Sequence, residues 1–166
     1  MNSFVRVGGV AFTILVSACA TSEMSTSLPG DPVPVVRLRS DPYSFTFVSG
    51  FDNPARLVVR DAATWQAIWA QTFKGGSVPT IPAVDFSREM LVVVALGSHS
   101  SGGYGILIDG ASDVSSGNVS VTVRSISPGA RCGVTGAFTQ PVDIARMPRR
   151  DGTVSFVERS QVTDCR

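Results

Sequence analysis

The sequence is poor in the residues from which many catalytic and nucleic-acid-binding sites are built. Its 166 residues include one histidine, His99, and one lysine, Lys74. The 14 basic residues nearly balance the 13 acidic ones, which gives a net charge of +1. Binding to nucleic acid needs a stripe of positive charge against the phosphates. The small cluster Arg146, Arg149 and Arg150 falls at the end of a strand pattern, so we expect no nucleic-acid partner.

Long hydrophobic runs are also missing, since a helix that spans a bilayer takes about 20 apolar residues. The apolar run near the N-terminus, Val7–Val16, is short and follows Arg6, a pattern typical of an export signal. Ser17 and Ala18 then precede Cys19. This arrangement resembles the bacterial lipobox, in which a peptidase cleaves before a cysteine whose thiol carries diacylglycerol.

We therefore expect residues 1–18 to be a lipoprotein signal peptide and Cys19 to be lipidated, with an ordinary cleaved signal as the alternative. Acyl chains contribute about 0.8 kcal/mol per buried CH₂, and more than one chain gives stable anchoring. Ala20 follows the cysteine, which favours the outer membrane in Gram-negative cells. The predicted location is the bacterial envelope, on its periplasmic or surface face, with the membrane as a partner through the lipid.

Cysteine is scarce, and the three that are present exclude a metal site of the usual kind because no CxxC or Cys/His spacing occurs. With Cys19 lipidated, Cys132 and Cys165 are left in an exported chain, where disulfides form. Their pairing would stabilise the fold by about 3–4 kcal/mol in the chain-entropy model. The alternative is two free thiols. We expect neither a metal nor another cofactor.

The segment after the signal reads as a tether and the remainder as one domain. Residues 19–42 are rich in Ser, Thr and Pro without an apolar period, as in an extended linker. The globular domain is expected over 43–166. Strand patterns within it cover 43–50, 55–61, 90–97, 103–114, 118–126, 141–148 and 153–160. The turn SSGN joins two of these strands as a hairpin, and RRDG links the last two as a pair.

One segment, DAATWQAIWAQTF, has a helical period. Its apolar residues share one face: Trp65, Ile68, Trp69 and Phe73. Asp61 or Thr64 can cap the start of the helix by accepting a backbone hydrogen bond. At this spacing the tryptophans favour a core position over a binding surface. The predicted fold class is α+β: a mostly antiparallel sheet, sandwich or barrel-like, of about seven strands with one amphipathic helix packed on it.

The stretch GSHSSGGYGILI holds the only histidine and three serines, but it does not form a recognised catalytic motif. Neighbouring residues of an extended strand point to opposite faces, so Ser98 and Ser100 are poorly placed to use His99 as a base. No G-x-S-x-G turn occurs, and the glycines lack the G-x-G-x-x-G order of a phosphate loop. We therefore predict that the chain is not an enzyme.

The remaining interpretations of this stretch are a structural turn or a loop for protein contact. Its small residues would let a partner's backbone come close. The candidate contact residues are Ser100, Ser101, Gly102, Gly103 and Tyr104. The glycine pair offers positive φ without steric cost.

A wider pattern is formed by Asp85, Phe86, Gly97, Gly102, Gly103, Tyr104, Pro128, Thr139 and Pro141. It resembles the C-terminal domain of the PrcB family, accessory lipoproteins of a bacterial surface protease complex. The helix with Trp65 and Trp69 also fits, so that the resemblance covers roughly residues 57–157. Many relatives have Pro-Thr where this chain has Ser100 and Ser101.

The resemblance implies a protein that assembles with, stabilises or inhibits a protease. The loops also resemble, more weakly, those of chagasin-type cysteine-protease inhibitors. The predicted function is thus that of a lipid-anchored envelope protein acting by protein–protein contact, with a protease as the candidate partner. The alternative is an envelope module that binds a small ligand without catalysis.

Overall fold

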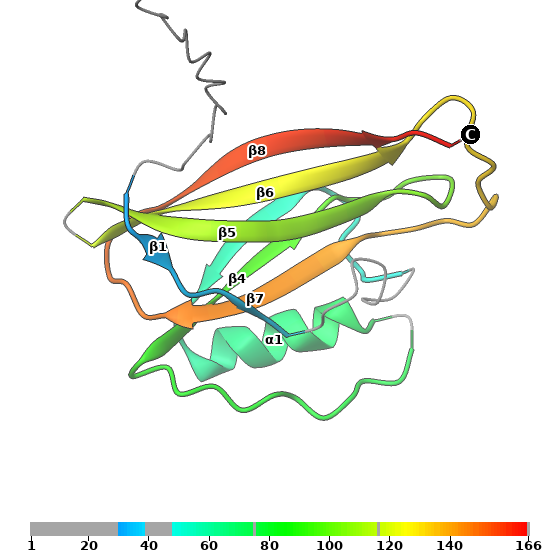
Figure 1. Cartoon of the computed structure of the whole chain (residues 1–166). Helices are drawn as coiled ribbons and strands as arrows, with labels where there is room; N and C mark the ends of the chain where they lie inside the picture. The colour runs from blue at the N-terminus through cyan, green and yellow to red at the C-terminus, as the bar shows by residue number, and fades with distance from the viewer. Residues whose placement is uncertain (1–29, 39–47, 75, 116, 166) are drawn as a thin grey trace, which may run out of the picture.

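A computed structural model describes residues 30–38, 48–74, 76–115 and 117–165 of the chain. Within these ranges the chain forms two four-stranded sheets and one helix (Figure 1). The elements in chain order are β1 (Pro32–Val33), β2 (Val36–Arg37), β3 (Ala55–Val59), α1 (Ala62–Thr72), β4 (Glu89–Ala95), β5 (Gly105–Ser115), β6 (Asn118–Pro128), β7 (Val142–Pro148) and β8 (Val154–Thr163). None of the helices described is long and apolar enough to cross a membrane.

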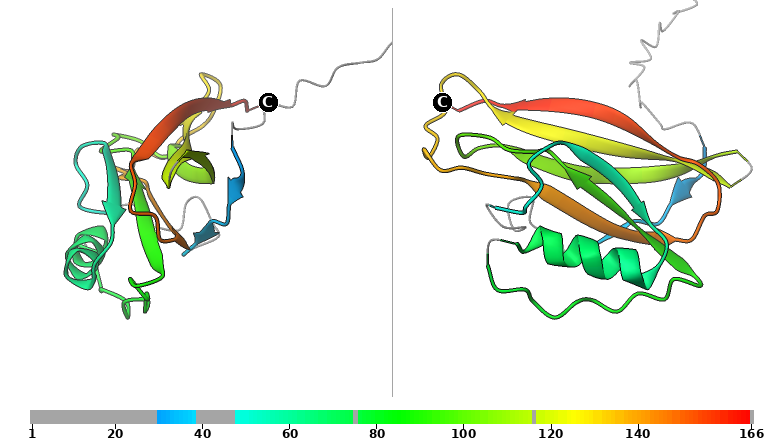
Figure 2. Two further views of the ribbon diagram at one scale, coloured as in Figure 1. Left: turned by 90° about the vertical axis from the view of Figure 1, so that its left-hand side faces the viewer. Right: turned by 180° about the vertical axis from the view of Figure 1, so that it is seen from behind.

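The elements stack in three layers, with the sheet β2-β7-β4-β3 between the helix and the sheet β1-β5-β6-β8 (Figures 1 and 2). All pairings are antiparallel except that of β6 with β8. The predicted α+β class, with one helix on a mostly antiparallel sandwich, is confirmed.

Strand β4 lies at the centre because both of its faces are apolar. Met90, Val92 and Val94 face the other sheet, whereas Leu91 and Val93 face the helix, and all five are fully buried. A continuous hydrophobic run is what a strand covered on both sides requires.

Helix α1 covers the outer face of this sheet with the stripe that the sequence indicates. Trp65, Trp69 and Phe73 are at most 6% exposed. The indole N–H groups of the two tryptophans donate to backbone carbonyls, that of Trp65 to Pro82 and that of Trp69 to Pro79. Asp61 caps the start of the helix by accepting from the Thr64 N–H at 2.8 Å. The tryptophans therefore belong to the core, as the spacing predicts.

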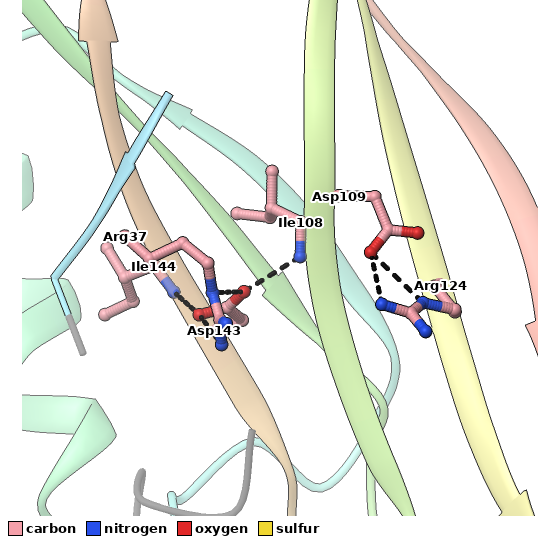
Figure 3. A network of polar contacts seen from close by, with 6 residues as sticks. All are labelled: Arg37, Ile108, Asp109, Arg124, Asp143 and Ile144. Carbon is pink, nitrogen blue, oxygen red and sulfur yellow. Dashed lines mark hydrogen bonds and ion pairs between the residues drawn. The ribbon is translucent and has the colours of Figure 1, made fainter. Parts of the chain in front are cut away.

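The predicted hairpin of β5 and β6 is also present, and Gly117 in its turn has a φ of 79°. The ladder slips by one residue between Ile108 and Gly110. The residue at this bulge, Asp109, accepts from the Arg124 guanidinium across the ladder at 2.7 Å (Figure 3).

Two predictions about the chain's course are wrong. Strands β7 and β8 do not pair: the RRDG linker carries the chain from one sheet to the other, and β8 runs parallel to β6. The predicted tether, residues 19–42, contains 30–38, which form β1 and β2 and join one sheet to the other. Val33 is 5% exposed, so the folded part begins before residue 43. Most of the predicted strand 43–50 lies outside the described residues, and 48–50 are not in a strand.

An ion pair between a buried carboxylate and a partly exposed arginine holds this N-terminal segment in place. Asp143 points from β7 into the space between the sheets and is 1% exposed. The Arg37 guanidinium binds both of its oxygens, at 2.8 and 3.1 Å (Figure 3). The same carboxylate accepts from the backbone N–H groups of Ile108 and Ile144. Burial raises the pKa of Asp143, and the Arg37 pair and the two N–H donors partly offset this rise.

Candidate protein-contact site

Three loops meet at one end of the sandwich, where the chain also terminates (Figure 1). We call this region the loop end and define it as residues 48–54, 97–104 and 129–141. It contains the predicted contact residues Ser100 to Tyr104. It lies opposite the β5–β6 turn.

Loop 97–104 is fixed against loop 129–141 by main-chain hydrogen bonds. The N–H of His99 donates to the Thr139 carbonyl at 2.8 Å, and the N–H of Thr139 donates back to His99 at 2.9 Å. Further along, the N–H of Gly102 donates to Thr135, and the Thr139 hydroxyl donates to the Ser101 carbonyl. The predicted contact loop is therefore one half of a two-loop unit.

Gln140 joins the third loop to these two. Its side chain is 2% exposed, and its amide nitrogen donates to Asp52 at 2.7 Å and to the Ser98 hydroxyl at 3.0 Å. Its amide oxygen accepts from the N–H of Gly50. One buried amide of loop 129–141 thus bonds to both of the other loops, and a buried polar group satisfied in this way fixes the relative positions of all three.

The glycine pair serves the turn in two different ways. Gly103 has a φ of 86°, in the left-handed region that favours glycine. Gly102 does not have positive φ; it is required for space, since a Cβ there would lie 2.5 Å from the Thr135 hydroxyl. The prediction of positive φ is therefore correct for one glycine and wrong for the other.

The residues of the predicted contact loop differ in exposure. Ser100 and Gly103 are exposed, Ser101 and Tyr104 are half-buried, and Gly102 is buried. The Tyr104 ring is stacked on the His99 imidazole. The surface that this loop offers to another molecule is therefore small and mostly backbone.

The larger apolar groups lie on the neighbouring loop, and the sequence analysis missed them. Phe138 is 52% exposed and Val134 is 43% exposed, and both lie in the stretch GVTGAFT. The sequence did hold a signal for Phe138. This aromatic residue stands among glycine, alanine and threonine, without the alternating apolar residues that would indicate a strand. Beside Phe138 lies a cavity of about 330 Å³, which is also lined by Asp52 and Lys74.

The geometry around His99 does not form a nucleophile and base. Its Nε2 atom is buried and has no hydrogen-bond partner, and burial lowers the pKa of the imidazole below 6.5. The Ser98 hydroxyl is engaged by Gln140. No group of three or more His, Cys, Asp or Glu side chains within the described ranges is arranged to hold a metal ion.

The disulfide lies at the same end. Cys132 in loop 129–141 is bonded to Cys165 just after β8, with their Cα atoms 5.0 Å apart. It connects the loop that carries Val134 and Phe138 to the last residues of the chain. Cys19, the predicted lipidation site, lies outside the described residues.

Fold and site together define an α+β domain of two sheets, with three loops at one end that are joined to one another by hydrogen bonds. Residues 90–148 match the family described as PrcB C-terminal. The family resemblance seen in the sequence is thus confirmed over that segment. The match runs from β4 to β7 and includes loops 97–104 and 129–141, but it covers less than half of the chain and leaves out α1 and β8. Neither curated proteins nor solved structures gave a match to this chain.

Proposed function

We propose that the protein is a non-catalytic accessory subunit that binds a protease through the loop end. The match to the PrcB C-terminal family suggests association with a protease complex. The observation that carries the proposal is the exposure of Phe138 and Val134 on a loop that hydrogen bonds already hold in place.

Physical reasoning favours a contact role for such a loop. Aromatic side chains that enter a partner's pocket supply much of the binding energy of protein interfaces. A surface that is ordered before binding loses less conformational entropy when the complex forms. Phe138 supplies the aromatic group, and the bonds made by Thr139 and Gln140 supply the order.

The predicted contact loop takes part in the same surface. Ser100 and Gly103 are exposed beside the Phe138 loop, and a residue without a side chain lets a partner's backbone approach closely. In this arrangement residues 100–104 form the shallow part of the contact and Phe138 forms its anchor.

Anchoring belongs to the proposal as well. A lipid on Cys19 would hold the domain at the envelope membrane, and the motif at residues 17–19 supports it. The proposed place is the outer membrane, on its periplasmic or surface face. The chain would then position its protease partner at the membrane by protein contact.

Site-specific photocrosslinking tests the contact. A photoreactive phenylalanine analogue replaces Phe138 in one variant and Val114 in another, both of which are 52% exposed. Val114 lies next to the β5–β6 turn, at the opposite end. We expect residue 138 to crosslink to a protease identified by mass spectrometry, and residue 114 to give no such adduct. Equal crosslinking at both positions, or adducts of residue 138 without a protease, would contradict the proposal.

A second candidate function, small-ligand binding, is supported by a different observation. A cavity of about 560 Å³ opens beside β2 and is lined in part by Val36, Arg88 and Arg146. Ligand sites commonly measure about 300–1,000 Å³. Native mass spectrometry of protein purified from the envelope tests this function: a bound molecule that Arg88→Ala displaces supports it, and protein of unmodified mass contradicts it.

A further inference from the structure

The four edge strands of the two sheets are very unequal. Strands β1 and β2 have 2 residues each and β3 has 5, whereas β8 has 10. Strand β8 runs along the outer margin of its sheet (Figure 1). Long edge strands present unpaired backbone groups, and natural proteins usually shorten or block them.

The hydrogen bonds of β8 show which of its backbone groups are free. The carbonyls of Thr153 and Thr163 accept from β6 residue Val119 and from Gly129, and no register shift intervenes. The odd-numbered residues between them therefore direct their backbone groups toward β6. The even-numbered ones, Val154, Phe156, Glu158, Ser160 and Val162, direct theirs away from the sheet.

Strand β8 lacks most of the features that block an edge. Residues 154–163 contain no proline, glycine or lysine, and the ladder with β6 has no bulge. Glu158 is the one charge on the inward side, and it forms an ion pair with Arg56 of β3 at 2.7 Å while remaining half exposed. On the outward side Val157 is 41% exposed. Arg159 is exposed and has no ion-pair partner in the described part of the chain.

A second copy of the chain is a poor occupant for this edge. In an antiparallel pair, a residue with free backbone groups must face another such residue. When a twofold axis relates two copies of the chain, two registers satisfy this rule and let the two β8 strands overlap almost fully. One sets Glu158 opposite Glu158, and the other sets Arg159 opposite Arg159. Like charges directly opposite are destabilising.

We propose that β8 binds an extended segment of another protein by antiparallel strand addition. The even-numbered backbone groups of β8 would supply the hydrogen bonds. Side chains would supply the selectivity: an acidic residue opposite Arg159 and, two positions further along the segment, a β-branched apolar residue opposite Val157. This surface is distinct from the loop end and does not rest on a protease partner.

The probe is a capped peptide, Thr-Val-Glu-Thr-Val-Val-Thr, which is titrated into the isotope-labelled protein. We expect it to shift the amide resonances of Phe156, Glu158 and Ser160 and to slow their hydrogen exchange. No binding, or shifts confined to other elements, would overturn the proposal. So would protection of the same amides by concentration-dependent dimerisation without peptide.

Two pairs of variants test the mechanism. Ser160→Pro removes a free N–H without touching the ladder with β6, so the fold should persist and peptide affinity should fall about tenfold. Ser160→Ala, the matched control, should bind as the unchanged protein does. Equal binding by the two variants would overturn strand addition.

The charge pair tests the register. Arg159→Glu should weaken binding about fivefold, and replacing the peptide's glutamate by lysine should restore it. Failure of this exchange would overturn the assigned register. Phe138→Ser should leave the titration unchanged, which separates this proposal from that of the protease contact.

Discussion

The imidazole of His99 lies flat on the ring of Tyr104, with centroids 3.9 Å apart and an angle of 14° between the planes. The two residues stand at either end of the turn 99–104, so the stack closes the turn. The histidine is also fixed at its backbone by Thr139. Substitutions in exposed loops usually change stability by no more than about 0.5 kcal/mol, but this stack implies a larger cost for His99→Ala.

The first prediction concerns His99→Phe, which keeps an aromatic ring on Tyr104 and removes the titrating nitrogen. The buried Nε2 has no partner, so an apolar replacement should leave stability at neutral pH unchanged or higher. Burial lowers the pKa of His99 in the fold. Between that value and 6.5 the unfolded chain holds the proton more often, so stability is full above pH 6.5 and falls as the pH drops through this window.

Denaturant unfolding at about pH 8 and about pH 5.5 measures this effect. The unchanged protein should lose more stability between the two pH values than His99→Phe does. Identical losses in the two proteins would show that His99 titrates with the same pKa in the folded and unfolded states.

The second prediction concerns the pair of Arg37 and Asp143. Arg37→Met leaves a buried carboxylate without its cation, and breaking such a pair costs about 3–5 kcal/mol. Arg131→Met is the control, because Arg131 and Asp164 are 72% and 71% exposed and a surface pair contributes about 0–1 kcal/mol. Free energies of unfolding measured in urea compare the two. If Arg37→Met lowers the free energy of unfolding as little as Arg131→Met does, the pair of Arg37 and Asp143 does not stabilise the fold.

The contrast between predicted and observed structure has a local physical cause. The apolar run of β4, the stripe of Trp65 and Trp69 and the Gly117 turn are set by neighbouring residues, and the sequence predicts them. The position of β8 depends on where the chain crosses between sheets after β7. No local pattern encodes the position of β8, because an edge strand beside β6 and one beside β7 need the same alternation of apolar and polar residues.

The loop end is less predictable for a similar reason. The turn 97–104 can be recognised from its glycines, but its bonds to Thr139 and Gln140 join residues about forty positions apart. Asp143 left a clearer signal, since it is a charged residue in the same phase of β7 as the buried Ala145 and Met147. Such a residue needs a cation, and Arg37 supplies it from a segment whose composition is that of a linker.

The third prediction concerns Cys132 and Cys165. In native protein isolated without reductant, non-reducing digestion should give one linked peptide pair and no alkylated thiol at either position. The double variant to serine should lose about 3–4 kcal/mol of stability in the chain-entropy model. Two alkylatable thiols in the native protein would contradict the bond.

The fourth prediction concerns Cys19. If a lipid on this residue anchors the chain, Cys19→Ala should release the protein from the membrane fraction or leave an uncleaved precursor. Labelling with a radioactive fatty acid provides the direct readout, and the double serine variant of Cys132 and Cys165 serves as the control because it removes both other cysteines and keeps Cys19. A cleaved Cys19→Ala protein that stays in the membrane fraction would rule out lipid anchoring at this residue.

The fifth prediction separates the two glycines of the turn. Gly103 has positive φ, so Gly103→Ala should cost about 1–3 kcal/mol from backbone strain that no neighbouring change relieves. Gly102→Ala brings a Cβ to within 2.5 Å of the Thr135 hydroxyl, a contact that adding Thr135→Ala should relieve. Gly136→Ala is the control, since a Cβ there meets no atom within 4 Å. Thermal melts of these variants measure the costs. A Cβ at position 103 would lie 3.1 Å from Val134, so rescue of Gly103→Ala by Val134→Ala would show that crowding, not φ, requires glycine there.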